Sequence, residues 1–476
     1  MKTYVLFLLV FSVVLISRLP FLDAGYGTDT DGCRVATAAR YIATTGEYKA
    51  SRLPGFPIIE FTCSLAWKNG ARFLNLLTAF MSAIAVGMLA IIAKKYGCKD
   101  FLLIAFTFAF TPVVYISSTI TMDYMWAIMF VMFCWYAGLF GKPFVAGSLL
   151  GIAIGCRITT AAMTLPFALL FLDHDNWKLS FIRILKFWCA AAVVAITAFL
   201  PVFLTYGWHF FTFFGPAFPP IATILKTITL DVWGIVGFSA ISIISFLVLV
   251  RKKTIHIVSL TSLFLQRNFS VCIAVLILFV IEYAIHPKDP GYLIPPIPFF
   301  LLIIARYFPR RQFVLMCGLI ILSSFVGTID SIDRPWSPKP SKLSILLDIS
   351  GRSIAVDLLG PIFNDHERRL QQMRFVQAVI ATSDSIGYKS AVVAGAWLPS
   401  IIENTQGSIP ESEFSDFSMK RNNVEFVNLM DKRLLLRFKK NGYRIYYLKT
   451  VEGYNYSVNA IDLRKEGAIE LIPGKI

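Results

Sequence analysis

Residues 72–93 read RFLNLLTAFMSAIAVGMLAIIA, and Lys94 and Lys95 follow directly. A predominantly apolar run of about 20 residues is long enough to cross a bilayer as a helix. The whole chain repeats this character, because 56% of its 476 residues are hydrophobic, only 16% are charged and the mean hydropathy is +0.66. One soluble core cannot bury so much apolar surface, so the sequence predicts an α-helical polytopic membrane protein.

Other apolar runs lie on both sides of this segment, and together they predict about eleven transmembrane helices. We expect a first helix from Tyr4 to about Leu22, with Arg18 snorkelling at its end, although Leu22-Asp23-Ala24 also offers a weak signal-peptidase site. The remaining runs lie at 101–118, 121–140, 143–156, 158–172, 185–205, 229–250, 269–285, 292–305 and 312–328. The short runs on either side of Arg157 are kept as two spans, since merging them would break the charge pattern described next.

Positive charge decides the predicted orientation. The formal net charge of +16 does not indicate nucleic-acid binding, because the Lys and Arg residues recur between apolar runs. Those in alternate loops, around residues 94–99, 142, 178–186, 251–267 and 306–311, fall on one side, which is predicted to be cytoplasmic. The first loop (23–71), the 206–228 loop, the 286–291 connection and everything after residue 329 then lie on the extracytoplasmic side.

The composition divides the chain into two predicted domains, a transmembrane domain over 1–329 and an extracytoplasmic α/β domain over 330–476. Within the second, residues 367–380 have the pattern of an amphipathic helix and residues 390–396 that of a buried strand. Residues 434–438 and 443–448 are predicted to form a hairpin that turns at Asn441-Gly442. We expect this domain to cover the site or to recognise an acceptor.

The first loop contains Gly27-Thr28-Asp29-Thr30-Asp31-Gly32-Cys33-Arg34. Asp31 stands at an N-cap position, apolar residues follow at helical spacing, and Gly46 ends the run, so a short helix on the membrane surface is expected, with a second beginning near Pro57. Two aspartates this close also fit an ordinary exposed turn. Cys33 and Cys63 share this loop, which leaves a disulfide between them open.

Further polar residues are expected on the same face. Asp123 stands at the mouth of the span that begins near residue 121, and Glu282 lies near the end of the 269–285 run. Ionisable groups at membrane depth are costly and indicate function. A capping or inter-helix hydrogen bond explains Glu282 equally well, whereas for Asp123 a functional role is favoured over that alternative. Arg157 is a headgroup anchor or a phosphate ligand, Lys288 is open to the same two interpretations, and His286 alone favours a structural role.

Carboxylates and cations on one face suit the transfer of a sugar whose leaving group is a lipid phosphate. A carboxylate accepts the proton of the acceptor hydroxyl, and cations stabilise the departing phosphate. The first loop supplies Asp29, Asp31, Arg34 and Arg52 for this chemistry.

Four segments resemble the C-type (GT-C) polytopic glycosyltransferases, the group of the aminoarabinose transferases and protein O-mannosyltransferases. They are Asp31 to Arg40, Arg52-Leu53-Pro54-Gly55-Phe56-Pro57, Met122-Asp123-Tyr124, and Pro287-Lys288 with Tyr292-Leu293-Ile294-Pro295, and they span residues 1–330 in the order of that group. The resemblance implies that Asp31 is catalytic and that Asp29 and Asp123 support it or bind metal. It leaves a divalent metal, Mg²⁺ or Mn²⁺, open as a cofactor held by Asp29, Asp31 and Asp123. It also implies that Lys288 and Arg157, with His286 and Tyr292, bind the donor phosphate, and that Arg34, Arg52 and Glu282 serve the acceptor or the loop. Gly32 departs from the family pattern, in which a second acid often follows the aspartate.

The resulting hypothesis is an inverting glycosyltransferase that moves a hexosyl or pentosyl group from a polyprenyl-phosphate donor to a lipid, glycan or protein acceptor. The expected location is a prokaryotic inner or plasma membrane, with the product a cell-envelope glycan, lipopolysaccharide or glycoprotein. A transporter or flippase of lipid-linked or small solutes is the main alternative and predicts repeated halves with broken helices near the midplane. A lipid phosphatase or a glycan ligase is the other alternative and predicts further Arg/His phosphate motifs.

Overall fold

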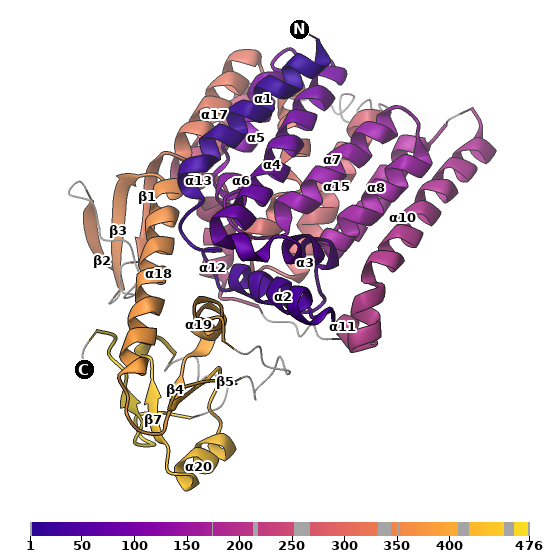
Figure 1. Cartoon of the computed structure of the whole chain (residues 1–476). Helices are drawn as coiled ribbons and strands as arrows, with labels where there is room; N and C mark the ends of the chain where they lie inside the picture. The colour runs from indigo at the N-terminus through magenta and orange to yellow at the C-terminus, as the bar shows by residue number, and fades with distance from the viewer. Residues whose placement is uncertain are drawn as a thin grey trace.

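The computed structural model describes residues 2–173, 175–212, 218–251, 267–331, 344–349, 352–407, 418–451 and 461–474. A bundle of apolar helices forms one part of the molecule, and a smaller part with strands packs at one end of it (Figure 1). The bundle contains α1 (Thr3–Arg18), α4 (Gly70–Lys95), α5 (Phe101–Ala109), α6 (Pro112–Ser117), α7 (Tyr124–Leu139), α8 (Pro143–Cys156), α9 (Thr164–Ala168), α10 (Trp177–Tyr206), α11 (His209–Thr212), α12 (Ile221–Lys226), α13 (Val232–Arg251), α15 (Arg267–Ile285), α16 (Ile297–Tyr307) and α17 (Arg310–Ser323).

Four helical stretches of the described chain are long and apolar enough to cross a membrane by length and composition. They are Thr3–Phe21, Trp67–Lys95, Trp177–Tyr206 and Ile221–Val250, and five shorter apolar helical stretches of 10–17 residues accompany them. The chain is therefore mostly helical and has the character of an integral membrane protein, while the predicted number of eleven spans stays a prediction.

Several predicted spans differ from the helices observed. The run 101–118 is broken between α5 and α6, because Pro112 begins a new helix and cannot donate to the ladder of the preceding one. The run 312–328 ends as a helix at Ser323, and its last residues enter strand β1 (Val326–Ser331). The two short runs around Arg157 are indeed separate, since α8 ends at Cys156 and Arg157 has extended backbone angles.

Arg18 does not snorkel to the surface as predicted. Its side chain is fully buried, where it donates to the Ser118 hydroxyl over 2.8 Å and to the carbonyl of Ala109. Its guanidinium also lies 3.8 Å from the centre of the Tyr115 ring. The first helix is thus joined to α5 and α6 by a buried cation, because these polar partners replace the water that the charge would otherwise need.

Glycines allow α8 and α10 to pack closely. Gly147, Gly151 and Gly155 are spaced four residues apart on α8, and an added Cβ at any of them would lie within 3 Å of atoms of α10. At Gly151, for example, that atom would lie 2.6 Å from Val194 Cβ. Small residues at this spacing let two backbones approach in lipid, where van der Waals packing rather than the hydrophobic effect holds helices together. This contact fixes the position of Arg157, the residue that follows α8.

The first loop forms the two short helices that its sequence predicts, while their place on the membrane surface stays a prediction. Helix α2 covers Asp31–Thr45 and ends at Gly46, whose φ of 76° is the left-handed conformation of a C-cap, and α3 covers Pro57–Ser64. The N-cap of α2 is Thr30, one residue before the predicted Asp31. Both helices lie across one end of the bundle (Figure 1), which we call the loop end.

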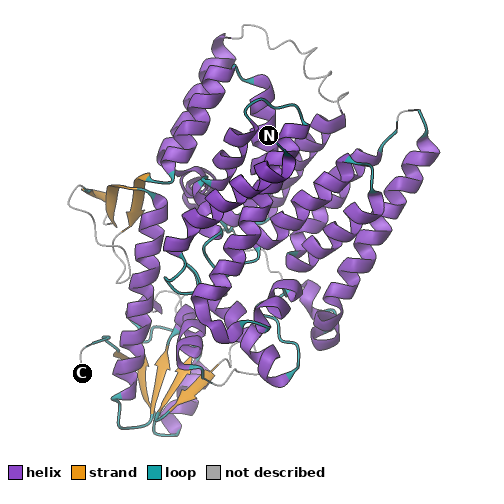
Figure 2. Cartoon of the chain, turned by 45° about the horizontal axis from the view of Figure 1, so that its top comes forward, coloured by secondary structure: helices purple, strands orange, loops and turns teal. Residues whose placement is uncertain are grey.

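The described residues of the C-terminal part form two sheets, with the strand orders β1-β3-β2 and β5-β6-β4-β7-β8. Its elements are β1, β2 (Ile345–Ile349), β3 (Arg352–Leu359), α18 (Pro361–Asp384), β4 (Ser390–Val393), α19 (Leu398–Thr405), β5 (Ser418–Arg421), β6 (Val424–Val427), α20 (Lys432–Lys440), β7 (Arg444–Tyr447) and β8 (Ile469–Glu470). Figure 2 shows the larger sheet next to α18 at the loop end. The predicted helix 367–380 lies within α18, and the predicted strand 390–396 contains β4.

The predicted hairpin is wrong. Residues 434–438 belong to helix α20, and β7 pairs in parallel with β4. Asp431 caps α20 by accepting the N–H of Leu434 over 2.6 Å, and the helix buries Leu435 and Phe438, which are spaced for a helix rather than a strand. The Asn441-Gly442 pair therefore ends a helix instead of turning a hairpin.

Candidate active site at the loop end of the bundle

A tight chain reversal places Asp29 and Asp31. The Asp29 carboxylate accepts the N–H of Asp31 over 2.8 Å at the start of α2. An added Cβ on Gly32 would lie 2.6 Å from the carbonyl oxygen of Tyr26, and the same carbonyl accepts the N–H of Thr121 over 2.7 Å. Glycine is required here because residues 26–27 fold back over the first turn of the helix, which gives a structural reason for the missing second acid.

Asp31 lies between two guanidinium groups. Arg52 Nε lies 3.2 Å from one carboxylate oxygen of Asp31, and Arg34 Nε lies 3.8 Å from the other. The Asp31 side chain remains 32% exposed, whereas that of Arg52 is only 17% exposed. The carboxylate is therefore held in a fixed orientation while one side of it stays accessible.

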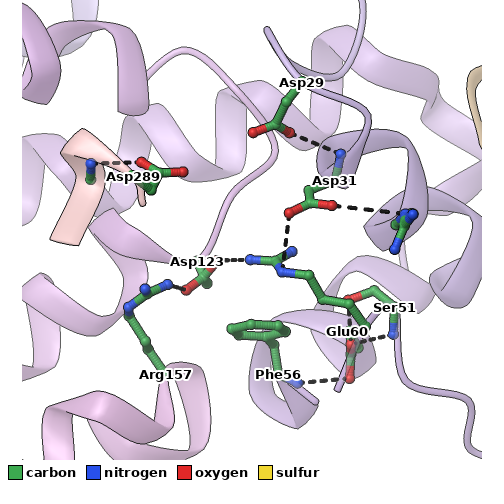
Figure 3. Close-up of polar contacts among 11 residues, drawn as sticks. Asp29, Asp31, Ser51, Phe56, Glu60, Asp123, Arg157 and Asp289 are labelled. Carbon is green, nitrogen blue, oxygen red and sulfur yellow. Dashed lines mark hydrogen bonds and ion pairs between the residues drawn. The ribbon is translucent and has the colours of Figure 1, made fainter. Parts of the chain in front are cut away.

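Asp123 precedes α7 and is almost completely buried. One oxygen accepts from Arg52 Nη2 over 3.0 Å and the other from Arg157 Nη1 over 2.5 Å, so both arginines share this carboxylate (Figure 3). Both oxygens are engaged, which does not favour the predicted metal-ligand role of Asp123. Within the described ranges, no three His, Cys, Asp or Glu side chains gather closely enough to hold a metal ion.

The guanidinium groups also stack on aromatic rings. The Arg157 group lies 4.3 Å from the centre of the Tyr124 ring and 4.7 Å from that of Tyr292, and the Arg52 group lies 4.1 Å from that of Phe56. Such stacking stabilises a cation that is shielded from water. It brings Tyr292, from the segment before α16, to the same centre as Asp123 and Arg157, as the sequence predicted.

Glu60, which sequence reasoning missed, holds the segment that carries Arg52. This fully buried carboxylate accepts from the backbone N–H of Ser51 over 2.7 Å, from the Ser51 hydroxyl over 2.6 Å and from the N–H of Phe56 over 3.1 Å. The Tyr48 hydroxyl donates to it as well. Burial raises the pKa of Glu60, and the hydrogen bonds that it accepts oppose that shift.

A cavity of about 380 Å³ opens beside Asp31. Residues from the first loop, the Arg157 connection, α15 and the C-terminal part form its walls. They are Asp31, Arg34, Thr37, Ala38, Lys49, Ala50, Ser51, Arg52, Leu53, Pro54, Phe56, Arg157, Ile158, Thr159, Glu282, His286, Tyr292, Pro399, Ile402 and Asn428. Arg34, Lys49, Arg52 and Arg157 outnumber the two carboxylates, Asp31 and Glu282, so the cavity suits an anionic ligand with an apolar portion.

Lys288 does not join this group. Its side chain is exposed, and it is not among the residues that line this cavity or the second one described below. Glu282 and His286, by contrast, both lie on the cavity wall. The cations available for a bound phosphate are therefore Arg157, Arg52, Arg34 and Lys49 rather than the predicted lysine.

A second cavity of about 300 Å³ lies on the side of Asp29. Asp29 and Asp289 line it together with Tyr124. Asp289, which was not singled out from the sequence, accepts the N–H of Gly291 over 2.7 Å, and Figure 3 shows it facing the same space as Asp29. The Asp29 side chain is exposed toward this cavity. Desolvation by the surrounding protein, together with the charges of Asp31 and Asp289, raises the pKa of Asp29 to about 7.

Cys33 and Cys63 are not paired, and both are buried free thiols. The Ser400 hydroxyl of α19 lies 3.4 Å from Cys33 Sγ. Cys63 instead packs in a small core with Val35 and Ile59. The predicted alternative of a disulfide in the first loop is therefore wrong for this structure.

Comparisons with known proteins add one similarity. No family model and no curated protein matches the chain. Among solved structures, the chain is similar to the crystal structure of ArnT from Cupriavidus metallidurans in the apo state, with 12% sequence identity, coverage of 81% of this chain and 82% of that chain, and a TM-score of 0.48.

Proposed function

We propose that this chain is an inverting membrane glycosyltransferase that uses a polyprenyl-phosphate sugar on the extracytoplasmic face. The observation that carries the proposal is the position of Asp31, an accessible carboxylate held by Arg52 and Arg34 on the wall of a cavity with a cationic excess. The cavity lies at the end of apolar helices, where a lipid tail can remain in the bilayer while its phosphate reaches Arg157 and Arg52.

The reaction assigned to the site is a single displacement. The acceptor hydroxyl oxygen forms a bond to the anomeric carbon, and the bond from that carbon to the phosphate oxygen breaks. Asp31 takes the hydroxyl proton, and the polyprenyl phosphate leaves with the bonding electron pair. Arg157 and Arg52 stabilise the charge that develops on the leaving phosphate, and the carboxylate also favours the oxocarbenium-like character of the sugar.

Asp29 and Asp123 support this base without performing its role. Asp29 fixes the first turn of α2 through the Asp31 N–H, and Asp123 holds both arginines in place. A divalent ion that arrives with the substrate would be compatible with the exposed side chain of Asp29. The buried charged side chains of the described apolar helices, such as Arg18, Asp123 and Arg157, lie at helix ends, which favours an enzyme over a transporter.

Reconstitution tests the proposal directly. The full-length protein in vesicles is supplied with radiolabelled polyprenyl-phosphate pentose or hexose, or with the corresponding nucleotide sugar, together with an acceptor extract from cells that lack the gene. We expect label to move from the lipid-linked donor with release of polyprenyl phosphate and with inversion at the anomeric carbon. Transfer from the nucleotide sugar alone, or solute movement without chemistry, would reject the proposed donor class.

A further inference from the structure

The C-terminal part of the chain forms one wall of the candidate active site. Strands β4 and β6 run parallel, and in Figures 1 and 2 their carboxyl ends face the helix bundle. The N–H of Ala394 donates to the carbonyl of Val427 over 2.9 Å, which ties the two strand ends together. In open α/β sheets, the segments that follow parallel strands at their carboxyl ends are where ligands bind.

Two such segments reach the cavity that contains Asp31. Helix α19 follows β4 and contributes Pro399 and Ile402, and Asn428 directly follows β6. All three residues line the cavity of about 380 Å³. Side chains more than 360 residues apart in sequence therefore face the same space.

The contact between α19 and α2 is polar and buried. Glu403 lies 3.6 Å from Arg40 Nε and accepts from the Thr37 hydroxyl over 3.1 Å and from the Tyr26 hydroxyl over 3.2 Å. Arg40 also donates to the carbonyl of Gly407 over 3.0 Å. These contacts hold α19 against α2. They also pair the negative charge of Glu403 with Arg40, so that this charge is directed toward α2 and away from the cavity.

The two sides of the cavity consequently differ in charge. Arg52 and Arg157 stand on the bundle side, whereas Pro399, Ile402 and Asn428 present two apolar surfaces and one neutral amide. An amide both donates and accepts hydrogen bonds, which suits a hydroxyl group. It carries no positive charge that would pair with a phosphate. A donor phosphate on the cationic side leaves the neutral side for the group that attacks from the opposite direction.

We propose that Asn428, with Pro399 and Ile402, forms an acceptor subsite for a neutral, hydroxyl-bearing headgroup, so that the C-terminal part selects the acceptor. This inference rests on the proposed function. It assigns a specificity-determining role to Asn428 and no part in the displacement itself.

The test separates acceptor binding from donor chemistry. Vesicles that contain the full-length chain receive labelled polyprenyl-phosphate sugar with increasing amounts of acceptor extract, and slow release of free sugar is measured without extract. Asn428→Ala is expected to raise the half-saturating amount of extract roughly 3- to 10-fold, as for the loss of one neutral hydrogen bond. The KM for the donor and the acceptor-independent release are expected to stay within about twofold of the wild type.

A matched variant controls for packing. Asn404→Ala removes an amide on α19 that donates to the Ser400 carbonyl over 2.8 Å and does not line the cavity. It is expected to leave the half-saturating amount of extract unchanged, and Asn428→Gln is expected to restore part of the loss in Asn428→Ala. Unchanged acceptor saturation in Asn428→Ala, or an equal change in donor KM, would overturn the inference while leaving the proposed function intact. A wild-type protein that neither releases nor transfers sugar would overturn both.

Discussion

Arg52 joins two carboxylates that come from different segments of the chain. Its Nε lies 3.2 Å from Asp31 and its Nη2 lies 3.0 Å from Asp123. This bridge connects the first loop to the start of α7, and Arg157 extends it to the end of α8 by binding the other oxygen of Asp123. The buried Asp123 therefore positions the more exposed Asp31 through Arg52, which both carboxylates share.

Arg52→Lys is expected to reduce transfer by about 10²- to 10³-fold, because one ammonium group cannot bond both carboxylates and stack on Phe56. Initial rates in donor-loaded vesicles measure the effect. Arg34→Lys is the matched control, since Arg34 is 40% exposed and lies 3.8 Å from Asp31, and it is expected to cost less than about tenfold. Equal losses in the two variants would contradict the bridging role of Arg52.

Asp29 is expected to produce an inflection in the pH profile of transfer near pH 7. Its raised pKa means that it is neutral below about pH 7 and ionised above it. The ionised Asp29 carboxylate accepts the Asp31 N–H more strongly and so holds the first turn of α2 more firmly, and the rate should therefore rise with pH through this range. Asp29→Asn should flatten the rise, as measured by rates between pH 5.5 and 8.5, and an unchanged inflection in the variant would assign it to another group.

Glu60→Gln is expected to lower the melting temperature of the detergent-solubilised protein. The two carboxylate oxygens of Glu60 accept four hydrogen bonds. Glutamine replaces one of these oxygens with an NH₂ group, which cannot accept, so the donors at that position lose their partner. Each buried donor left unpaired costs about 1–3 kcal/mol. Glu47→Gln, at an exposed residue that accepts from the Tyr41 hydroxyl, should change stability by less than about 0.5 kcal/mol. Similar melting temperatures for both variants would show that Glu60 does not hold the Arg52 segment.

The sequence predicted the two helices of the first loop from local signals, and it predicted the meeting of distant residues from the alternation of the spans. Gly46 ends α2, Pro57 begins α3, and the alternation of spans places Asp31, Asp123 and Arg157 at one end of the bundle. Their direct ionic contacts bear out the expectation that these segments lie together, while their chemical roles remain proposals. The bridge itself could not be predicted, since no pattern states which arginine meets which carboxylate.

Other features could not be predicted, because the neighbouring sequence gives either no signal for them or signals for two different structures. Glu60 lies in a short apolar helix. The neighbouring sequence does not indicate that its carboxylate accepts hydrogen bonds from the backbone N–H groups of Ser51 and Phe56. Asn441-Gly442 fits both a hairpin and a helix terminus, and the Asp431 cap together with the basic last turn of α20 decides for the helix. Lys288 matched a family motif, but its exposed position in the structure depends on how the connection before α16 turns.

The sidedness of the membrane is a separate prediction. A phosphatase reporter fused after residue 474 is expected to be active in a bacterial host, because the positive-inside pattern places the C-terminal part outside. The same reporter fused after Lys142 should be inactive. The reverse result would place Asp31 and its cavity on the cytoplasmic side and exclude an extracytoplasmic donor.

The most direct test of the central claim is the turnover of Asp31→Asn in vesicles loaded with a labelled polyprenyl-phosphate sugar. Asparagine keeps the size of the side chain but cannot take the hydroxyl proton, so transfer should fall by about 10²- to 10⁴-fold while expression and melting temperature stay close to those of the wild type. Turnover at the wild-type rate in this variant would contradict the assignment of Asp31 as the catalytic base.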